Sequence, residues 1–253
     1  DQSTNVPDKW KWEFTPNNVL FMNGTNDSTQ NPQVQFTASG PFTVKLRVSN
    51  AGGFDDTVRT NYIKTFITYC AASATSTADD DIGNVTLTDT LTKVVLLSNG
   101  IDTPFTPRPD ANKMYTNWAD SASVVVPNVN KGGVYNLRIG AIWSGFRYSA
   151  WATAYIDFNR NGSFNDPGEL IDLGFLSNAT GVSNRLAVNF RVPCDADTGI
   201  TRMRILLDES GSSTIASCSP AAGVTWGEVE DYNIRIVPTT LTYNSSIADQ
   251  TIL

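Results

Sequence analysis

The sequence predicts an all-β protein built from antiparallel β-sandwiches, and three observations favour this fold class. Thr, Ser, Asn, Val and Gly dominate the composition, while only 17% of the 253 residues are charged. Apolar residues alternate with polar ones in many short runs, and clusters of turn-forming residues separate these runs. No stretch shows the apolar period of a long helix. The hydrophobic content of 40% is enough to fill a core in each of two domains.

A first series of predicted strands extends from Trp10 to about Lys64. Alternation is clear in Trp10-Lys-Trp-Glu-Phe14 and again from Phe42 to Val48. Turn-forming residues at 23–28 and 49–53 separate these runs. We therefore expect a small sandwich over residues 1–65.

A second and longer series follows over residues 66–237, and 238–253 is expected to be a linker or the first strand of a following module. In the run 151–158, Ala152, Ala154 and Ile156 share one side, so Asp157 leaves the strand on the opposite side. We expect about nine strands, at 85–87, 92–97, 123–126, 134–143, 151–158, 170–173, 185–192, 202–207 and 230–237.

Composition excludes several classes of function. The chain contains no histidine, so histidine-dependent nucleophile activation and histidine-based zinc sites are excluded. The net charge of −7 disfavours nucleic acid and anionic membrane surfaces as partners. The apolar runs are far shorter than the roughly 20 residues that span a bilayer. We expect a non-catalytic segment of a longer exported protein, with no nucleic-acid partner and no membrane span.

A calcium site is predicted in the loop that follows the strand ending at Phe158. Calcium binds six to eight oxygens, and this loop offers an oxygen-bearing side chain at every second residue before a sharp turn at Gly162. The affinity should lie between about micromolar and millimolar, as in extracellular modules. An Asn/Gly-rich hairpin that bonds only its own turn is the alternative. The expected ligands are Asp157, Asn159, Asn161, Ser163, Asp166 and Glu169.

An acidic run near the end of the chain has two interpretations. Glu228, Glu230 and Asp231 precede or begin a predicted strand that contains Tyr232. A carboxylate from this strand, Glu228 first among them, could complete the calcium shell. The alternative is a solvated acidic turn in which Tyr232 packs inward.

The first segment carries three motifs: Trp10-Lys-Trp-Glu-Phe14, Asn31-Pro-Gln-Val-Gln-Phe36 and the run from Gly40 to Gly53. With these motifs, residues 9–64 resemble the later half of PKD domains, which have an immunoglobulin-like fold. It implies that the first strands of the module lie before Asp1. The sheet edge left open would then be able to pair with a strand of another chain or of the same protein.

The second segment carries four motifs in order: Tyr69-Cys70, Tyr155 to Phe164, Gly199-Ile-Thr-Arg-Met-Arg204 and Gly227-Glu-Val-Glu-Asp-Tyr232. With these motifs, residues 66–237 resemble the GEVED domain of secreted Bacteroidetes proteins. This resemblance implies a β-sandwich, jelly-roll-like in its strand series, and a secreted or cell-surface location. It also implies a disulfide between Cys70 and Cys218, with a Cys194–Cys218 bond as the alternative.

Two functions follow from these patterns. The first is a non-catalytic, calcium-stabilised structural or adhesion module of a large secreted or cell-surface bacterial protein. Its partners would be neighbouring domains, other surface proteins or glycans. The second is a carbohydrate-binding accessory domain of a secreted hydrolase or peptidase, with Trp118, Trp143 and Trp151 as a ligand platform. Packing of these aromatic residues in the core is the alternative.

Overall fold

The computed structural model confirms the all-β class: its described residues form strands, turns and loops, and none forms a helix. No helix that could span a membrane is therefore found in this part of the chain. The chain divides into two compact units, Asp1–Tyr69 with Arg160–Ser163, and Cys70–Asn159 with Phe164–Leu253. The described residues are 3–4, 6–37, 39–76, 80–100, 114–143, 146–179, 183–209, 215–218 and 224–239, so most of the predicted linker 238–253 lies outside them.

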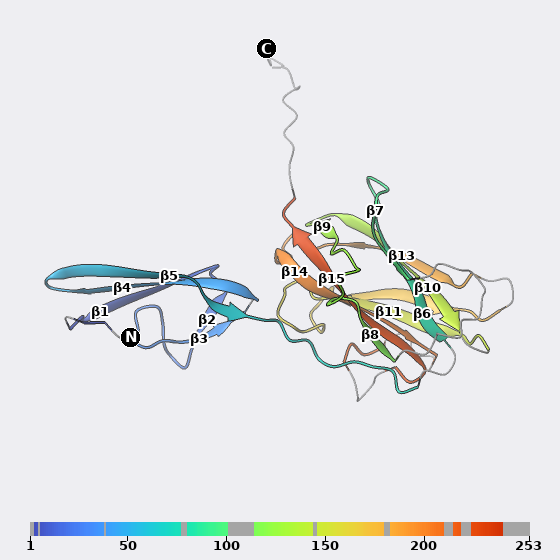
Figure 1. The fold of residues 1–253 in the computed structure, drawn as a ribbon, viewed down its shortest axis with the longest axis horizontal. Coiled ribbons are helices and arrows are strands. Elements are labelled where there is room, and N and C mark those ends of the chain that lie inside the picture. Colours follow the sequence, from blue (N-terminus) through green and yellow to red (C-terminus); the bar gives the residue numbers. More distant parts are fainter. Residues whose placement is uncertain are drawn as a thin grey trace, which may run out of the picture. The chain divides into compact units, whose positions relative to one another are not determined.

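The first unit contains a three-stranded antiparallel sheet and a two-stranded one (Figure 1). The larger sheet has the order β1 (Lys9–Thr15), β4 (Gly40–Asn50), β5 (Gly53–Thr65), and the smaller one pairs β2 (Val19–Met22) with β3 (Gln33–Phe36). Both sheets form because alternating apolar runs are joined by Asn- and Gly-rich turns.

The core of the first unit lies at one end of its larger sheet. Phe42 is fully buried, and Phe14 and Val44 are buried beside it. Phe36 from β3 packs against both phenylalanines, with ring centroids 6.0 Å from Phe14 and 4.6 Å from Phe42. Farther along the same face of β4, Leu46 is only half-buried. The smaller sheet therefore covers one end of the apolar row and leaves the other end open.

The second unit contains a four-stranded and a six-stranded sheet, whose facing sides enclose one core (Figure 1). Most strand pairs are antiparallel, but β8 and β9 both pair in parallel with β15. The four-stranded sheet has the order β13 (Arg185–Arg191), β10 (Val134–Trp143), β6 (Asp80–Asp89), β7 (Val95–Gly100). The six-stranded sheet has the order β12 (Leu170–Leu176), β11 (Ala150–Ile156), β14 (Gly199–Asp208), β15 (Gly227–Val237), β8 (Tyr115–Asn117), with β9 (Asn128–Asn130) also on β15.

The alternation predicted for residues 151–158 is present in β11. Ala152, Ala154 and Ile156 are fully buried in the core between the two sheets. The opposite face of β11 is also buried, since Thr153 is 0% and Tyr155 5% exposed. Something other than the second sheet must therefore cover that face.

Residues 70–76 form one segment over the outer face of the six-stranded sheet, and the described residues 215–218 and 224–226 belong to a second segment far along the sequence. We call these residues the covering layer. The hydroxyl of Tyr155 donates to the carbonyl of Ile215 at 2.7 Å. The amide of Thr75 donates to the carbonyl of Val224 at 3.0 Å, which joins the two segments. The Cys70–Cys218 disulfide joins them again, with a Cα–Cα distance of 5.5 Å.

The disulfide expected from the family resemblance is thus confirmed, and the Cys194–Cys218 alternative is wrong because Cys194 is a free, exposed thiol.

The strand predicted at residues 123–126 is wrong. That segment forms a turn in which the amide of Val124 donates to the carbonyl of Ser121, and the Ser121 hydroxyl bonds the amide of Ser123. Serine side chains compete with strand pairing in this way.

Candidate functional site

The predicted calcium loop connects β11 to β12, and hydrogen bonds close it at its base. The amide of Ile156 donates to the carbonyl of Glu169 at 3.0 Å, next to the strand pair Tyr155–Leu170. The amide of Phe158 donates to the Glu169 side-chain Oε1 at 2.9 Å. The first and last predicted ligands, Asp157 and Glu169, therefore lie at the same end of the hairpin.

Glu169 lies at this base near two other acidic residues, Asp157 and Asp166. Asp157 is 0% and Glu169 2% exposed, and the amide of Asp166 donates to the second Glu169 oxygen at 3.4 Å. Burial, followed by the charges of Asp157 and Asp166, raises the pKa of Glu169 to about 7. This arrangement favours either a proton or a cation among the three groups.

The middle of the loop turns where the sequence predicts. Arg160 and Gly162 have φ angles of 56° and 86°, in the left-handed region that glycine adopts without strain. Between them, the Asn161 side-chain oxygen accepts a bond from the amide of Ser163 at 2.8 Å. Phe164 is 1% exposed and packs against Tyr155, with ring centroids 6.0 Å apart. A buried aromatic side chain thus fixes the loop to the outer face of the sheet.

The structure gathers some of the predicted ligands and not others. Asp157, Asn159, Asn161, Ser163, Asp166 and Glu169 share this one loop. Within the described residues, no group of three or more Asp, Glu or Cys side chains is already arranged as metal ligands. Glu228 lies opposite Leu207 on β14, whereas the amide of Asp157 donates to the carbonyl of Arg202, which is also on β14. Leu207 and Arg202 are five residues apart, which is roughly 16 Å along a strand. Glu228 is therefore too far from Asp157 to complete the loop.

Glu228 and Glu230 instead belong to a buried polar network inside the sandwich. Oxygens of Glu228 accept bonds from the amide of Ile82 at 3.1 Å and the hydroxyl of Thr116 at 2.6 Å. Oxygens of Glu230 accept bonds from the Trp118 indole at 2.7 Å and the Tyr232 hydroxyl at 2.8 Å. Neither glutamate is in a solvated turn, although Tyr232 does pack inward as the second interpretation predicts.

Burial, followed by the charges of Glu230 and Asp81, raises the pKa of Glu228 to about 9. Glu228 is therefore protonated at neutral pH. It connects β15 of the larger sheet with β6 of the smaller one through the amide of Ile82. Its contacts make it a structural link between the two sheets.

Asp231 points to the other face of β15 and forms the main buried ion pair. Arg204 donates to its two oxygens at 2.7 and 2.8 Å, and Arg202 donates at 2.9 Å. The Tyr115 hydroxyl also donates to Asp231, and burial followed by this carboxylate raises the pKa of Tyr115 to about 12. The Arg204 guanidinium further donates to the carbonyl of Ser217 at 2.7 Å. Asp231 thus supports the covering layer through Arg204.

The roles of Arg202 and Arg204 were not predicted. The signal was present, because two arginines at alternate positions of one strand share a face, and an acid on the neighbouring strand can face both. The missing information was the register, which pairs Arg204 with Asp231.

The glycine that begins the acidic run is required by its backbone conformation and by a close contact. Gly227 has a φ of 140°, and a Cβ at this position would lie 2.1 Å from the carbonyl oxygen of Leu207.

The three tryptophans predicted as a ligand platform do not share a surface. Trp143 is 7% exposed and lies beneath the Arg147 guanidinium. Trp118 packs partly against the core while it donates to Glu230. Trp151 lies on the outer face, 5.1 Å from the ring of Phe175, which is 49% exposed. Core packing therefore explains the first two, and Trp151 with Phe175 forms the aromatic pair nearest to solvent.

Comparison with known families supports the resemblance found for the second segment. The family model of the GEVED domain matches residues 151–235, from β11 to near the end of β15. The match includes the loop of residues 157–169, the two arginines of β14 and the acidic start of β15. Comparison with curated proteins gives no match. The PKD resemblance of residues 9–64 stays a prediction.

Proposed function

We propose that this chain is a non-catalytic, calcium-stabilised structural or adhesion module of a large secreted or cell-surface bacterial protein. The observation that carries the proposal is the base of the β11–β12 loop, where Glu169 is buried next to the charges of Asp157 and Asp166. A divalent cation would offset the repulsion among these groups better than a proton, because it can be shared by several oxygens.

The donor set fits calcium. The loop residues Asp157, Asn159, Asn161, Ser163, Asp166 and Glu169 offer carboxylate, amide and hydroxyl oxygens, which are the hard ligands that calcium prefers. Bound calcium would supply a cross-link between the ends of the hairpin. The buried Phe164 already fixes the loop to the sheet, so rigidity gained in the loop would extend to the face beneath it.

Several features support an extracellular structural role. The Cys70–Cys218 disulfide is typical of proteins that fold in oxidising compartments. The acids of β15 that were considered as further calcium ligands, Glu228 and Glu230, instead accept hydrogen bonds inside the sandwich. We further propose that the first unit is a PKD-like immunoglobulin module, and that neighbouring domains or other surface proteins are the partners.

The test is calcium-dependent thermal unfolding of the chain after chelator treatment. Calcium at about a hundred times its dissociation constant adds about 2.7 kcal/mol of stability, which raises the melting temperature by roughly 5–10 °C in a unit of this size. The variants Asp166→Asn and Glu169→Gln should reduce or abolish this rise. Asp195→Asn, which changes an exposed acid outside the loop, is the matched control. An unchanged melting temperature of the wild-type chain in calcium up to about 100 mM, a hundred times the weakest expected dissociation constant, would contradict the proposal.

Carbohydrate binding is the second candidate, favoured by the Trp151–Phe175 pair at the surface. Aromatic rings at a surface are able to stack against sugar rings. Binding to a glycan array that is lost in Trp151→Ala and Phe175→Ala, and kept in Trp226→Ala, would support it. Trp226 is 45% exposed and serves as the matched aromatic control. Equal binding by all variants would exclude the pair as the site.

A further inference from the structure

The outer edge of β5 is long and exposed. β5 is the last strand in the order β1-β4-β5, and in the described part of the chain it pairs with β4 alone. Every residue from Gly53 to Tyr62 is exposed, including Val58 at 56%. An edge strand of this kind presents backbone donors and acceptors to a further strand.

β5 is regular over its first half only. Its pairing with β4 runs without interruption from Gly53 to Arg59, and the register then shifts between Phe42 and Val44. Asn61 has a φ of 50° at this irregularity. Such bulges stop strand pairing from continuing. The edge available to a further strand is therefore centred on residues 55–59.

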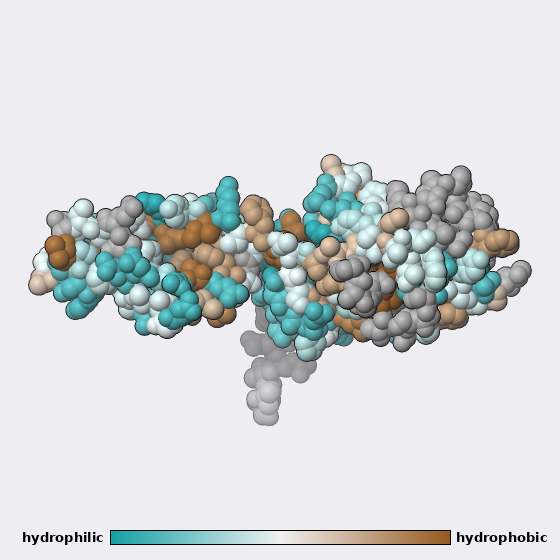
Figure 2. Space-filling model, turned by 90° about the horizontal axis from the view of Figure 1, so that it is seen from below, coloured by the Kyte–Doolittle hydropathy of each residue, from teal (hydrophilic) through white to brown (hydrophobic). Residues whose placement is uncertain are grey.

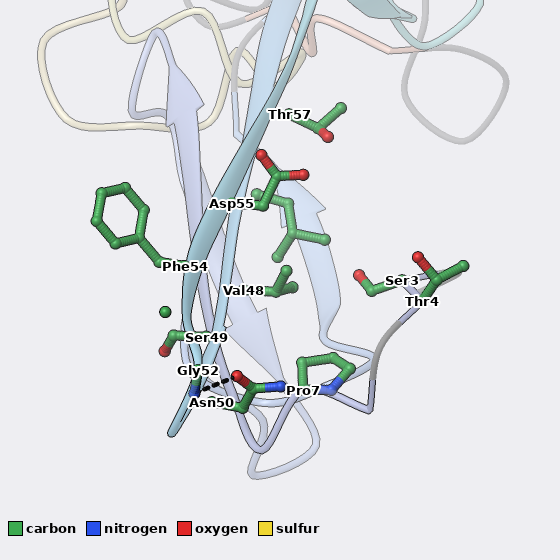
Figure 3. Close-up of a pocket in the computed structure, with 12 residues that line it drawn as sticks. Ser3, Thr4, Pro7, Val48, Ser49, Asn50, Gly52, Phe54, Asp55 and Thr57 are labelled. Carbon is green, nitrogen blue, oxygen red and sulfur yellow. Dashed lines mark hydrogen bonds between the residues drawn. The ribbon is translucent and has the colours of Figure 1, made fainter.

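The side chains of this half-strand alternate between two faces. Asp55, Thr57 and Arg59 are paired with Val48, Leu46 and Val44, so they share the face that carries the apolar row. That face borders a groove of about 630 Å³, shown in Figure 3, where Asp55 and Thr57 lie on the side opposite to Phe54. Figure 2 shows apolar residues at the surface of this unit between hydrophilic ones.

The order acid, hydroxyl, base along this face is self-complementary. In an antiparallel pair related by a two-fold axis through Thr57, Asp55 of one copy lies directly opposite Arg59 of the other, and the pair occurs twice. An axis through Asp56 would instead place that acid opposite its own copy. An axis through Val58 would place Asp55 opposite Asn61 in the irregular region. Charge therefore selects one register.

We propose that two copies of this chain associate through antiparallel pairing of their β5 edges, with Thr57 on the two-fold axis. Two three-stranded sheets become one continuous six-stranded sheet. The axis is perpendicular to the sheet, so both apolar rows lie on the same face of it. This inference goes beyond the calcium proposal, and it concerns β5 of the first unit, so each can fail without the other.

Charge reversal tests both the interface and its register. Wild-type chain should run at twice its mass of 27.5 kDa in light scattering at high micromolar concentration. Asp55→Arg or Arg59→Asp replaces two attractive pairs by two repulsive ones and should raise the dimer dissociation constant about tenfold or more. The double variant should restore the dimer, because the pairs form again with their signs exchanged. Asp195→Arg, the control in the second unit, should leave it unchanged.

Cysteine cross-linking tests the position of the axis. In a Cys194→Ser background, Thr57→Cys places two thiols directly opposite each other, at about 4.5–5.5 Å between Cβ atoms, which is close to disulfide distance. Added oxidant should then give a covalent dimer. Val58→Cys should give much less, because its copies are offset along the strands. A monomeric wild-type chain, a dimer insensitive to both charge reversals, or equal cross-linking at 57 and 58 would overturn the proposal.

Discussion

The two units place similar alternating strands in different surroundings. In β11 of the second unit both faces are buried, by the opposite sheet and by the covering layer. In β4 of the first unit, Phe42 and Val44 are buried, whereas Leu46 and Val48 on the same face are only half-buried. Alternation decides which side chains share a face, but segments distant in sequence decide whether that face is covered.

Removal of the disulfide should have the largest effect on the covered unit. Replacing Cys70 and Cys218 by alanine opens a loop of 148 residues, and the chain-entropy model gives a loss of about 4–5 kcal/mol. Denaturant unfolding of the second unit measures this loss. Cys194→Ala removes the exposed thiol and is expected to change the free energy of unfolding by less than about 0.5 kcal/mol. Equal effects of the two changes would contradict the role given to the disulfide.

Loss of the ion pair beneath the covering layer should be nearly as costly. Arg204→Ala leaves Asp231 buried with fewer donors and should destabilise the second unit by about 3–5 kcal/mol. Arg202→Ala removes a single bond from a more exposed side chain and should cost less. Chemical denaturation of both variants checks the order. If Arg202→Ala costs as much as Arg204→Ala, the covering layer does not depend on Arg204 in the proposed way.

A core substitution should distinguish the half-covered unit. Phe42→Ala removes the only fully buried phenylalanine among the described residues of the first unit and should cost about 3 kcal/mol. The second unit should unfold as before, because its core is separate. Phe54→Ala, at a side chain 68% exposed, is the matched control and should cost less than about 0.5 kcal/mol. A parallel loss in both units would show that they fold as one.

The buried Glu228 predicts a pH dependence confined to the second unit. Its pKa is about 9 in the fold and near 4.5 when unfolded, so the unfolded chain loses this proton first. Its contribution to stability is complete below about pH 4.5 and is lost as the pH rises towards 9, by at most about 1.4 kcal/mol per unit. Glu228→Gln stays neutral and should gain over wild type between pH 5 and 9.

Denaturant midpoints at pH 5, 7 and 9 measure this gain. Glutamine can accept the bond from the Ile82 amide while its own NH₂ group donates to the Thr116 hydroxyl, so both partners are kept and only the direction of the Thr116 bond is reversed. Asp195→Asn controls for the loss of one exposed charge. A difference between Glu228→Gln and wild type that is the same at all three pH values would contradict a protonated Glu228.

The sequence predicted the strands better than their partners. The runs at 134–143, 151–158 and 202–207 correspond to β10, β11 and β14 within a few residues, because their alternation is strong. Loop residues 157–169 are contiguous, so their proximity follows from the chain itself. The burial of Glu228 and the pairing of Arg204 with Asp231 depend on register between strands, which alternation alone does not determine.

The disulfide has a mechanical consequence for a module held at both ends. Cys70 is the first residue of the second unit, and Cys218 lies 148 positions further along the chain. A pulling force would pass through this bond and leave the intervening polypeptide slack. At about 3.5 Å per residue, roughly 500 Å of contour length would be withheld from extension until the bond is reduced.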